Sequence, residues 1–379
     1  MTFKRLKSLL VAVFSLSILF FSNASVAQDA GDTIDPRLKH ENTELRGHEN
    51  EEKFDPAEVI MEHIKDGHEF HFATLGHNHV TIPLPVIAYS PQRGLDAFMS
   101  SKFHHGEHAY NGYKLEHGKL VAVDQHGNVD ESVKVYDLSM TRNVVQMIIA
   151  LALLVWIMTS IAKKYSKGEG TRTAPTGLQN LIEPVITFVR DDVAKPNLGK
   201  KYEKYLPYLL TVFFFILINS MFGLLPGSAN VTGNIAFTAV LGVISFIVIM
   251  FSSNSHYWGH IVNPPVPMGI KPILVPVEIL GIFTKPFALI VRLFANMVAG
   301  HIIILSFVSL IFIFGGMNKG IGWGFAPVSI LFTVFIYLIE ILVAFIQAFI
   351  FTNLTAVFIG QAFEGSHDDV DGHEDAVIL

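Results

Sequence analysis

The sequence predicts an all-α polytopic membrane protein with about five membrane segments, preceded by a small β-containing extramembrane region. The 379-residue chain is 51% hydrophobic and only 16% charged, whereas soluble domains carry about a quarter charged residues. The charges are unevenly spread, since residues 206–255 contain no Asp, Glu, Lys or Arg. Several apolar runs reach the ~20 residues that a helix needs to cross a bilayer.

Composition also excludes several classes of function. The net charge of −6 gives no indication of nucleic-acid binding. The absence of cysteine removes disulfides, thiolate metal sites and cysteine catalysis. The chain has no Gly-rich phosphate loop, so we expect no nucleotide chemistry in it and no bound cofactor.

Residues 1–27 have the pattern of a secretory signal peptide. Basic residues precede an apolar run over residues 9–21, and small residues stand at the cleavage positions before residue 28. We expect cleavage after Ala27, because the run is short for a membrane span of ~20 residues. The alternative is an uncleaved anchor helix, and in both cases residue 28 emerges on the far side of the membrane.

Residues 28–141 are predicted to form a His-rich, acidic periplasmic region. They contain twenty acids, ten Lys and Arg, and twelve of the histidines. The first thirty residues have a composition typical of disorder. Later segments alternate in the manner of strands and are separated by turn residues: EFHFATL, HVTIPLPVIAYS, KLVAVDQ and VKVYDLSM. We expect a small β-rich cap on the membrane domain rather than a free-standing domain.

Residues 142–365 are predicted to form the membrane domain, which begins with a span over residues 143–162. The stretch 163–204 follows, with nine Lys and Arg against five acids, and contains an amphipathic segment, GLQNLIEPVITFVRD. Next comes a predicted helical hairpin over residues 206–225 and 235–251. The positive-inside rule places the basic stretch in the cytoplasm, in agreement with the signal peptide. We therefore expect a multi-pass protein of the bacterial inner membrane with a periplasmic N-terminus and a cytoplasmic C-terminus.

The last two apolar segments are longer than a bilayer requires. Residues 328–359 contain neither Pro nor Gly, and a helix of that length would have to tilt by about 50° to stay within a core ~30 Å thick. The preceding segment, residues 272–314, is also overlong, although four residues could divide it: Pro276, Gly281, Pro286 and Gly300. We expect two long, steeply tilted helices followed by an acidic cytoplasmic tail, residues 366–379.

Arg292 stands within the apolar run FALIVRLFANMVAGHIII. Its guanidinium cannot lose its charge, and a charge at membrane depth is costly and by default marks a functional site. The structural alternative is an arginine that reaches the interface, or that pairs with a neighbouring helix to hold the bundle together. Helical spacing puts small or polar residues on the same face: Ala288, Ala295, Asn296 and Ala299. Small residues allow another helix to approach closely, so we expect this face to meet a close-packed partner.

Other polar residues are embedded in the last two segments. In the final one, a single helical face carries Glu340, Ala344, Gln347 and Ala348. His301 and Glu340 are both titratable, so they can either relay protons or form a hydrogen-bonded pair that packs two helices. Glu340 and Glu278 are candidate counter-ions for Arg292, but each lies on a different segment. A carboxylate from another chain is therefore an open alternative.

Three motifs, RLFANMVAGH, FTKPFAL and QAFIFTNLT, resemble the a-subunit of rotary F-type ATP synthases, and the likeness covers roughly residues 135–365. It implies that Arg292 is the family's essential arginine and that Asn296 is the polar residue one turn later. Gln347 matches the glutamine that packs near the arginine. Glu278 and Lys285 match positions toward the cytoplasmic side.

The chain departs from some bacterial relatives at two places. The family's interacting acid and histidine occur here in swapped order, with His301 first and Glu340 second. Many bacterial members carry an Asp in the loop before the third span, whereas this chain reads ANVTGNIAFT. Asn230, Thr232 and Asn234 would then line the periplasmic entrance without a charge.

The resemblance implies a non-catalytic stator that forms two offset aqueous half-channels against a ring of c-subunits. Protons would enter past Asn234, His301 and Glu340, protonate a ring carboxylate, and leave near Glu278 after nearly a full turn. Arg292 would stand between the half-channels. The implied partners are the c-subunit ring, the peripheral-stalk b-subunits, the rest of the ATP synthase, protons and the lipid membrane.

Two other functions are considered. A secondary transporter for a metal or other cation would use the periplasmic histidines, which occur as HEFH at 68–71, HNH at 77–79 and HHGEH at 104–108. We interpret these clusters as a solvated, pH-sensitive polar cap and predict no metal site, because no surrounding support for a metal can be identified. An envelope structural protein is the second alternative, but it leaves Arg292, His301 and Glu340 unexplained.

Overall fold

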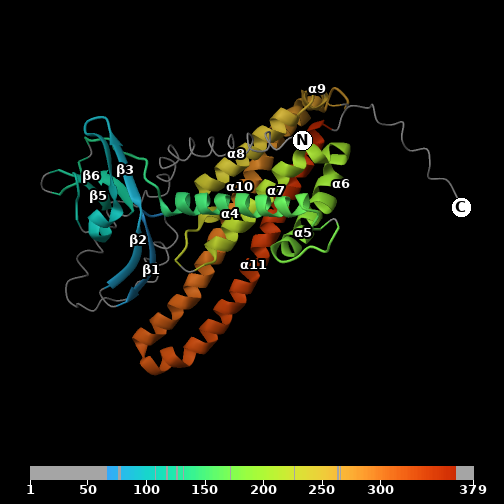
Figure 1. The fold of residues 1–379 in the computed structure, drawn as a ribbon. Helices are drawn as coiled ribbons and strands as arrows, with labels where there is room; N and C mark the ends of the chain where they lie inside the picture. The colour runs from blue at the N-terminus through green and yellow to red at the C-terminus, as the bar shows by residue number, and fades with distance from the viewer. Residues whose placement is uncertain are drawn as a thin grey trace.

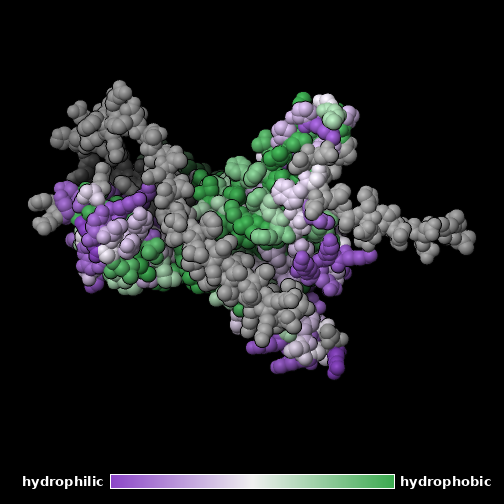
Figure 2. All heavy atoms as spheres, turned by 90° about the horizontal axis from the view of Figure 1, so that it is seen from above, coloured by the Kyte–Doolittle hydropathy of each residue, from purple (hydrophilic) through white to green (hydrophobic). Residues whose placement is uncertain are grey.

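The computed structural model describes residues 66–363, apart from residues 76–77, 107, 117, 125–126, 131, 171, 226, 263 and 265. The predicted signal peptide, the segment predicted to be disordered and the predicted acidic tail lie outside the described residues. Within them, five helical segments are long and apolar enough to cross a membrane, which confirms the predicted fold class. Figure 2 shows apolar side chains across the middle of the molecule and hydrophilic ones toward both ends.

The first membrane helix, α4 (Arg142–Ser166), agrees with the predicted span and ends with Lys163 and Lys164 in its last turn. Basic residues in the last turn interact favourably with the helix dipole and suit the headgroup region at one end of the span. The predicted hairpin is also confirmed, as α7 (Tyr202–Gly223) and α8 (Ile235–Ser252) joined through the short helix η5 (Val231–Gly233). A buried hydrogen bond of 2.9 Å between the Tyr208 and Ser245 hydroxyls links the two helices of the hairpin.

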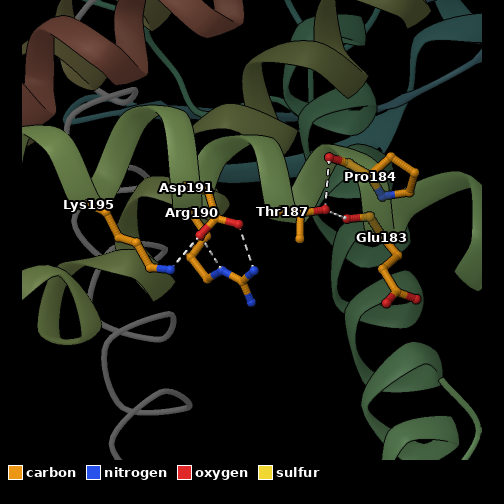
Figure 3. Close-up of polar contacts among 6 residues, drawn as sticks. All are labelled: Glu183, Pro184, Thr187, Arg190, Asp191 and Lys195. Atoms are coloured by element: carbon orange, nitrogen blue, oxygen red, sulfur yellow. Dashed lines mark hydrogen bonds and ion pairs between the residues drawn. The ribbon is translucent and has the colours of Figure 1, made fainter. Parts of the chain in front are cut away.

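The amphipathic segment forms α5 (Leu178–Phe188), which continues into a π-helical turn, η3 (Val189–Ala194), and the short α6 (Lys195–Leu198). One side buries Val189, Val193 and Ala194. The other is polar: Figure 3 shows Arg190 and Lys195 turned toward Asp191, at nitrogen–oxygen distances of 2.7 Å each. Such surface pairs contribute at most ~1 kcal/mol, so the buried face holds this segment in place.

The two longest helices are α10 (Lys271–Met317) and α11 (Lys319–Phe363). At 1.5 Å per residue each is about 70 Å long, which exceeds the ~30 Å hydrocarbon core. Figure 1 shows them as a hairpin that runs obliquely to α4. The possible division of the first segment is not observed, because Pro276 and Pro286 lie inside an unbroken α10. In lipid every backbone polar group needs a partner, so a helix tolerates a proline better than it tolerates a break into open backbone.

Close contacts at glycine hold the long helices against their neighbours. A Cβ at Gly242 of α8 would overlap the Ile290 side chain of α10. A Cβ at Gly322 would collide with the backbone of Gly315, near the turn of the α10–α11 hairpin. A Cβ at Gly360 would collide with the carbonyl oxygen of Asn197. Helix packing in membranes depends on such small residues, because lipid removes the hydrophobic drive for association.

The described residues that precede α4 form a small β domain at its N-terminal end (Figure 1). It consists of a two-stranded, a three-stranded and a second two-stranded sheet, ordered β1-β2, β4-β3-β7 and β5-β6. The strands are β1 (Glu69–Leu75), β2 (Asn78–Pro83), β3 (Pro85–Ser90), β4 (Gly94–Met99), β5 (Tyr113–Glu116), β6 (Lys119–Ala122) and β7 (Tyr136–Asp137), with the 3₁₀ helix η2 (Ser100–Gly106) after β4. Each of the four predicted segments contains strand, although KLVAVDQ does so only over β6 and VKVYDLSM only over the two residues of β7. The strands β4 and β5 were not predicted. The core of the domain contains Val86, Ala88, Phe103, Tyr113 and Leu120.

The β domain is joined to α4 by hydrogen bonds as well as by the chain. Asp66 Oδ1 accepts from the Asn143 amide at 3.2 Å, and the Arg142 amide donates to the Gly67 carbonyl at 2.9 Å. Thr141, which precedes α4, makes no side-chain cap of its own. Asp66 therefore satisfies one of the free amides at the start of α4 from a distant part of the sequence.

His68 corrects the interpretation of the histidines as a solvated cap. Its ring is 5% exposed, and Nε2 lies 2.8 Å from Asp137 Oδ2. Burial acts to raise the pKa of Asp137, but the hydrogen bond and charge of His68, together with hydrogen bonds from Ser139, outweigh it and hold that pKa below its ordinary value. The ionised Asp137 therefore stabilises the folded domain.

We expect Asp137→Ala to destabilise the β domain by about 1–3 kcal/mol, because the buried His68 ring loses its partner. In the unmodified protein, the stabilisation from Asp137 should be fully present at neutral pH. It should be lost as pH falls below about 5, since the depressed pKa means that the unfolded chain takes up the proton first. Hydrogen exchange at the Leu138 amide, which donates to the Ile87 carbonyl, measures both effects.

Asp130→Ala is the matched control, because Asp130 is only partly buried and its carboxylate accepts hydrogen bonds from nearby Ser132. It should leave exchange at Leu138 nearly unchanged. Equal protection in both variants would contradict the stabilising role of Asp137.

Candidate functional site

Arg292 lies on α10 with its side chain exposed, on the face predicted from helical spacing. The small or polar residues of that face are also exposed on the isolated chain: Ala288, Ala295, Asn296 and Ala299. The opposite face is buried against the other helices through Leu289, Leu293 and Met297. α10 therefore uses one face for packing within the chain and leaves the arginine face open.

Arg292 has no ionic partner within the part of the chain that the structure describes. Glu340 is not placed to supply one. Its carboxyl group packs against Gly300, and residues 292 and 300 are about 12 Å apart along a helix axis. The charge of Arg292 is thus available to a group outside this chain.

Asn296 and Gln347 are brought together by the α10–α11 pairing. The Asn296 amide donates from Nδ2 to Gln347 Oε1 at 2.9 Å, and Gln347 is only 2% exposed. Since Asn296 follows Arg292 by one helical turn, this bond fixes α11 against α10 close to the arginine. Ala344 and Ala348 are fully buried on the same face of α11, as the pattern of small and polar residues predicted.

Glu340 lies on that buried face of α11 and is 6% exposed. Its carboxyl group approaches α10 at Gly300, where a side chain would overlap it. His301, the next residue of α10, is half-buried at the same level of the bundle. The two predicted titratable residues therefore belong to facing helices at one depth.

Sequence reasoning treated Gly300 only as a residue that might divide the helix. The structure shows instead that Gly300 makes room for the Glu340 carboxyl group. Spacing within one segment could not show this, because the partner lies on another helix.

The end of the helix pair at which α10 begins and α11 finishes carries a second polar group. Lys285 donates from Nζ to Gln361 Oε1 at 3.1 Å and lies over the Phe358 ring, 5.0 Å from its centroid. Glu278, which precedes Lys285 in α10, is half-buried. Burial, and then the negative charge of Glu278, raises the pKa of Tyr257, which lies in the short helix α9 (Ser255–Val262).

At the opposite end, Asn234 acts as the N-cap of α8. Its side chain accepts from the Ala236 amide at 2.9 Å, and Asn230 likewise accepts from the Gly233 amide at 3.0 Å. Thr232 between them is fully buried. The loop that lacks the family's Asp is therefore a folded turn, and its polar side chains are partly used to hold it.

Several buried polar atoms near this turn have no partner within the described protein: Asn219 Oδ1, Ser220 Oγ, Asn230 Nδ2 and Thr232 Oγ1. Buried polar atoms are normally satisfied by protein or by water. Gln146 of α4, which was not singled out from the sequence, supports the same region. Its side chain donates to the Ala229 carbonyl and accepts from the Ala229 amide. The loop is thus a polar region enclosed by α4, α7 and α10.

The histidines that precede α4 do not assemble a metal site among the residues that the structure describes, since no trio of His, Cys, Asp or Glu is close enough to hold an ion. His104 and His108 lie near each other, with ring centroids 5.2 Å apart. The side chains of His71, His77, His79 and His105 lie outside the description.

The chain has five segments able to cross a membrane. It also has an exposed arginine within one of them and polar groups at both ends of a tilted helix pair. These features define the class of multi-span membrane proteins that transport ions. The chain belongs to the ATP synthase A chain family, which matches residues 144–360. As a member it is a non-catalytic, multi-pass subunit of the ATP synthase membrane sector in the bacterial inner membrane.

The chain is similar to ATP synthase subunits a of green sulfur bacteria. It is 48% identical to that of Chloroherpeton thalassium over 245 residues, which cover 63% of this chain and 71% of the relative. It is 38% identical to subunit a 2 of Chlorobium luteolum over 357 residues, 92% of this chain and 88% of the relative. Residues 59–138 also match a domain of unknown function, DUF8433. The β domain thus matches a family of its own, separate from the one that covers the membrane helices.

We expect Gly300→Ala to reduce ATP-driven proton translocation several-fold in the assembled complex, because the new methyl group displaces the Glu340 carboxyl. Gly281→Ala is the matched control, since Gly281 lies in the same helix and has open space around it. In a helix Gly→Ala is otherwise favourable by about 1 kcal/mol. Acidification of inverted vesicles measures the effect, and equal rates in the two variants would contradict it.

Proposed function

We propose that this chain is the proton-conducting stator of an F-type ATP synthase, forming two half-channels against the c-subunit ring and coupling proton flow to rotation. The observation that carries the proposal is Arg292, an exposed cation on a small-residue face with no ionic partner among the described residues. Such a face suits a helix of another subunit that brings its own carboxylate. The chain works with the c-subunit ring, the b-subunits, the rest of the ATP synthase and protons.

Arg292 has the role of a fixed charge that ring carboxylates meet in turn. Two unit charges about 4 Å apart attract by about 4 kcal/mol at an effective dielectric of 20. That attraction favours the ionised carboxylate beside Arg292 and opposes its protonation there. The same charge repels a proton that would cross directly between the half-channels, so protons pass only by way of the ring.

The periplasmic half-channel follows the polar turn around Asn234 and then His301 and Glu340. The buried polar atoms without protein partners near this turn support a hydrated path. The Glu340 carboxyl group lies against Gly300, the neighbour of His301. This proximity supports proton delivery to the ring carboxylate at the depth of His301. Asn296 and Gln347 are positioning residues, because their hydrogen bond holds α11 beside the arginine.

The cytoplasmic half-channel ends near Glu278, with Lys285 and Tyr257 in the same region. This assignment requires a periplasmic N-terminus and a cytoplasmic C-terminus, with the basic stretch around α5 in the cytoplasm. It also follows the domain organisation inferred from the sequence: signal peptide 1–27, periplasmic region 28–141, membrane domain 142–365 and acidic tail 366–379.

Arg292→Ala is expected to abolish coupled proton translocation while the complex still assembles, because the fixed charge is lost and the exposed face remains small. ATP-driven acidification of inverted vesicles measures translocation, and co-purification with the c-subunit ring measures assembly. Arg172→Ala, at an exposed arginine outside the helix pair, should leave both unchanged. A normal rate of acidification in Arg292→Ala would refute the proposal.

His301→Ala is expected to slow passive proton flux strongly if the residue relays protons, and to leave it unchanged if the residue only packs helices. The swapped order of the pair gives a sharper test. His301→Glu and Glu340→His should each impair flux, because each leaves two like groups. The double variant should recover a large part of it. Failure of the double variant to exceed both single variants would argue against an interacting pair.

A further inference from the structure

The three-stranded sheet of the β domain has one face packed in the core of the domain and one face exposed. Directly opposed residues in antiparallel strands point to the same face. Val86 with Phe98 and Ala88 with Asp96 form the inner face, which packs on η2, β5 and β6. The other face is formed by three pairs, Pro85 with Met99, Ile87 with Ala97 and Tyr89 with Leu95, and Tyr136 of β7 lies beside Tyr89.

None of the paired residues of this outer face has a charged side chain, and Lys134 lies at its edge beside Tyr136. One-sided antiparallel sheets normally turn polar residues toward water. Leu95 is 67% exposed, and Tyr89, Met99 and Tyr136 are each 43% exposed. The strand continues beyond β7 with Leu138, which is also exposed. An exposed apolar face of this kind marks a surface that contacts another protein or a membrane.

The outer face cannot lie far from the bilayer. Only residues 138–141 separate β7 from α4, a span of at most about 14 Å. Leu138 and Met140 remain hydrogen-bonded to Ile87 and Pro85 along this stretch, and the Arg142 amide is bonded to Gly67. The sheet is therefore fastened to the residue at which α4 begins.

The orientation of the outer face agrees with the short link between β7 and α4. In Figure 1, β5 and β6 lie on the side of the domain away from the membrane helices, and β3 lies between them and the helices. Since the inner face packs on β5 and β6, the outer face is turned toward the membrane side. Figure 2 shows apolar side chains along one edge of the domain and hydrophilic ones at the end farthest from the helices.

The residues of the face suit the lipid interface. Tyrosine is enriched at the headgroup level, where its ring is in apolar surroundings and its hydroxyl is hydrated. Lys134 lies with Nζ 5.3 Å from the centroid of the Tyr136 ring, so its long side chain can follow the face and place the ammonium among phosphates.

We propose that the outer face of the β4-β3-β7 sheet rests on the periplasmic leaflet of the bilayer and that lipid is its occupant. The domain is then a membrane-surface cap that fixes the entry of α4. This inference depends on the membrane location of the helices and not on proton conduction, so the two proposals can fail separately.

The experiment uses the fact that the chain has no cysteine. Leu95→Cys and Met99→Cys are each labelled with a polarity-sensitive fluorophore in the complete ATP synthase. The labelled complex is reconstituted in phosphatidylcholine vesicles with or without brominated acyl chains. Glu116→Cys is the control, because Glu116 is exposed on β5 at the far side of the domain.

We expect bromolipid to quench the labels at residues 95 and 99 strongly and the label at residue 116 little or not at all. Aqueous iodide should give the reverse order. Strong iodide quenching at 95 and 99 would show a face open to water and overturn the proposal. Protection there from both quenchers would show a protein occupant, either another part of this chain or another subunit, and would overturn it equally.

Discussion

The rest of the structure depends on the electrostatic cost of Arg292, a charge that cannot be neutralised by loss of a proton. A helix can hold such a charge at membrane depth only if a partner lowers its cost. Within the described chain, α10 uses its opposite face for packing and leaves the arginine face open. The exposed arginine face is the basis of our proposal that a carboxylate of another subunit completes the site.

Close packing of α10 and α11 gives the arginine its fixed surroundings. Gly300 admits the Glu340 carboxyl, and the Asn296–Gln347 bond joins the helices one turn from Arg292. Both contacts depend on small side chains nearby, because larger ones would separate the helices. The length of the two helices has a related cause, since unbroken helices keep every backbone group bonded as they cross the bilayer obliquely.

Much of this was predictable from particular residues. The apolar run around Arg292 predicted a cation within a membrane-spanning helix, and helical spacing predicted which neighbours share its face. The β domain was harder to predict. β4 and β5 were missed because their alternation is weak, and His68 was expected in solvent because its partner, Asp137, is 69 residues away. Gly300 was misjudged for the same reason, as its partner belongs to another helix.

The sequence by itself determined the number and apolarity of the membrane helices, the charge at position 292 and the family to which the chain belongs. These properties follow from composition and short-range periodicity, which any segment carries with it. Only the tertiary structure decided that Glu340 meets Gly300, that Asp66 caps α4 and that the β4-β3-β7 sheet leaves one apolar face exposed. Each of these joins residues distant in the chain, and only the packing of complete elements brings such residues together.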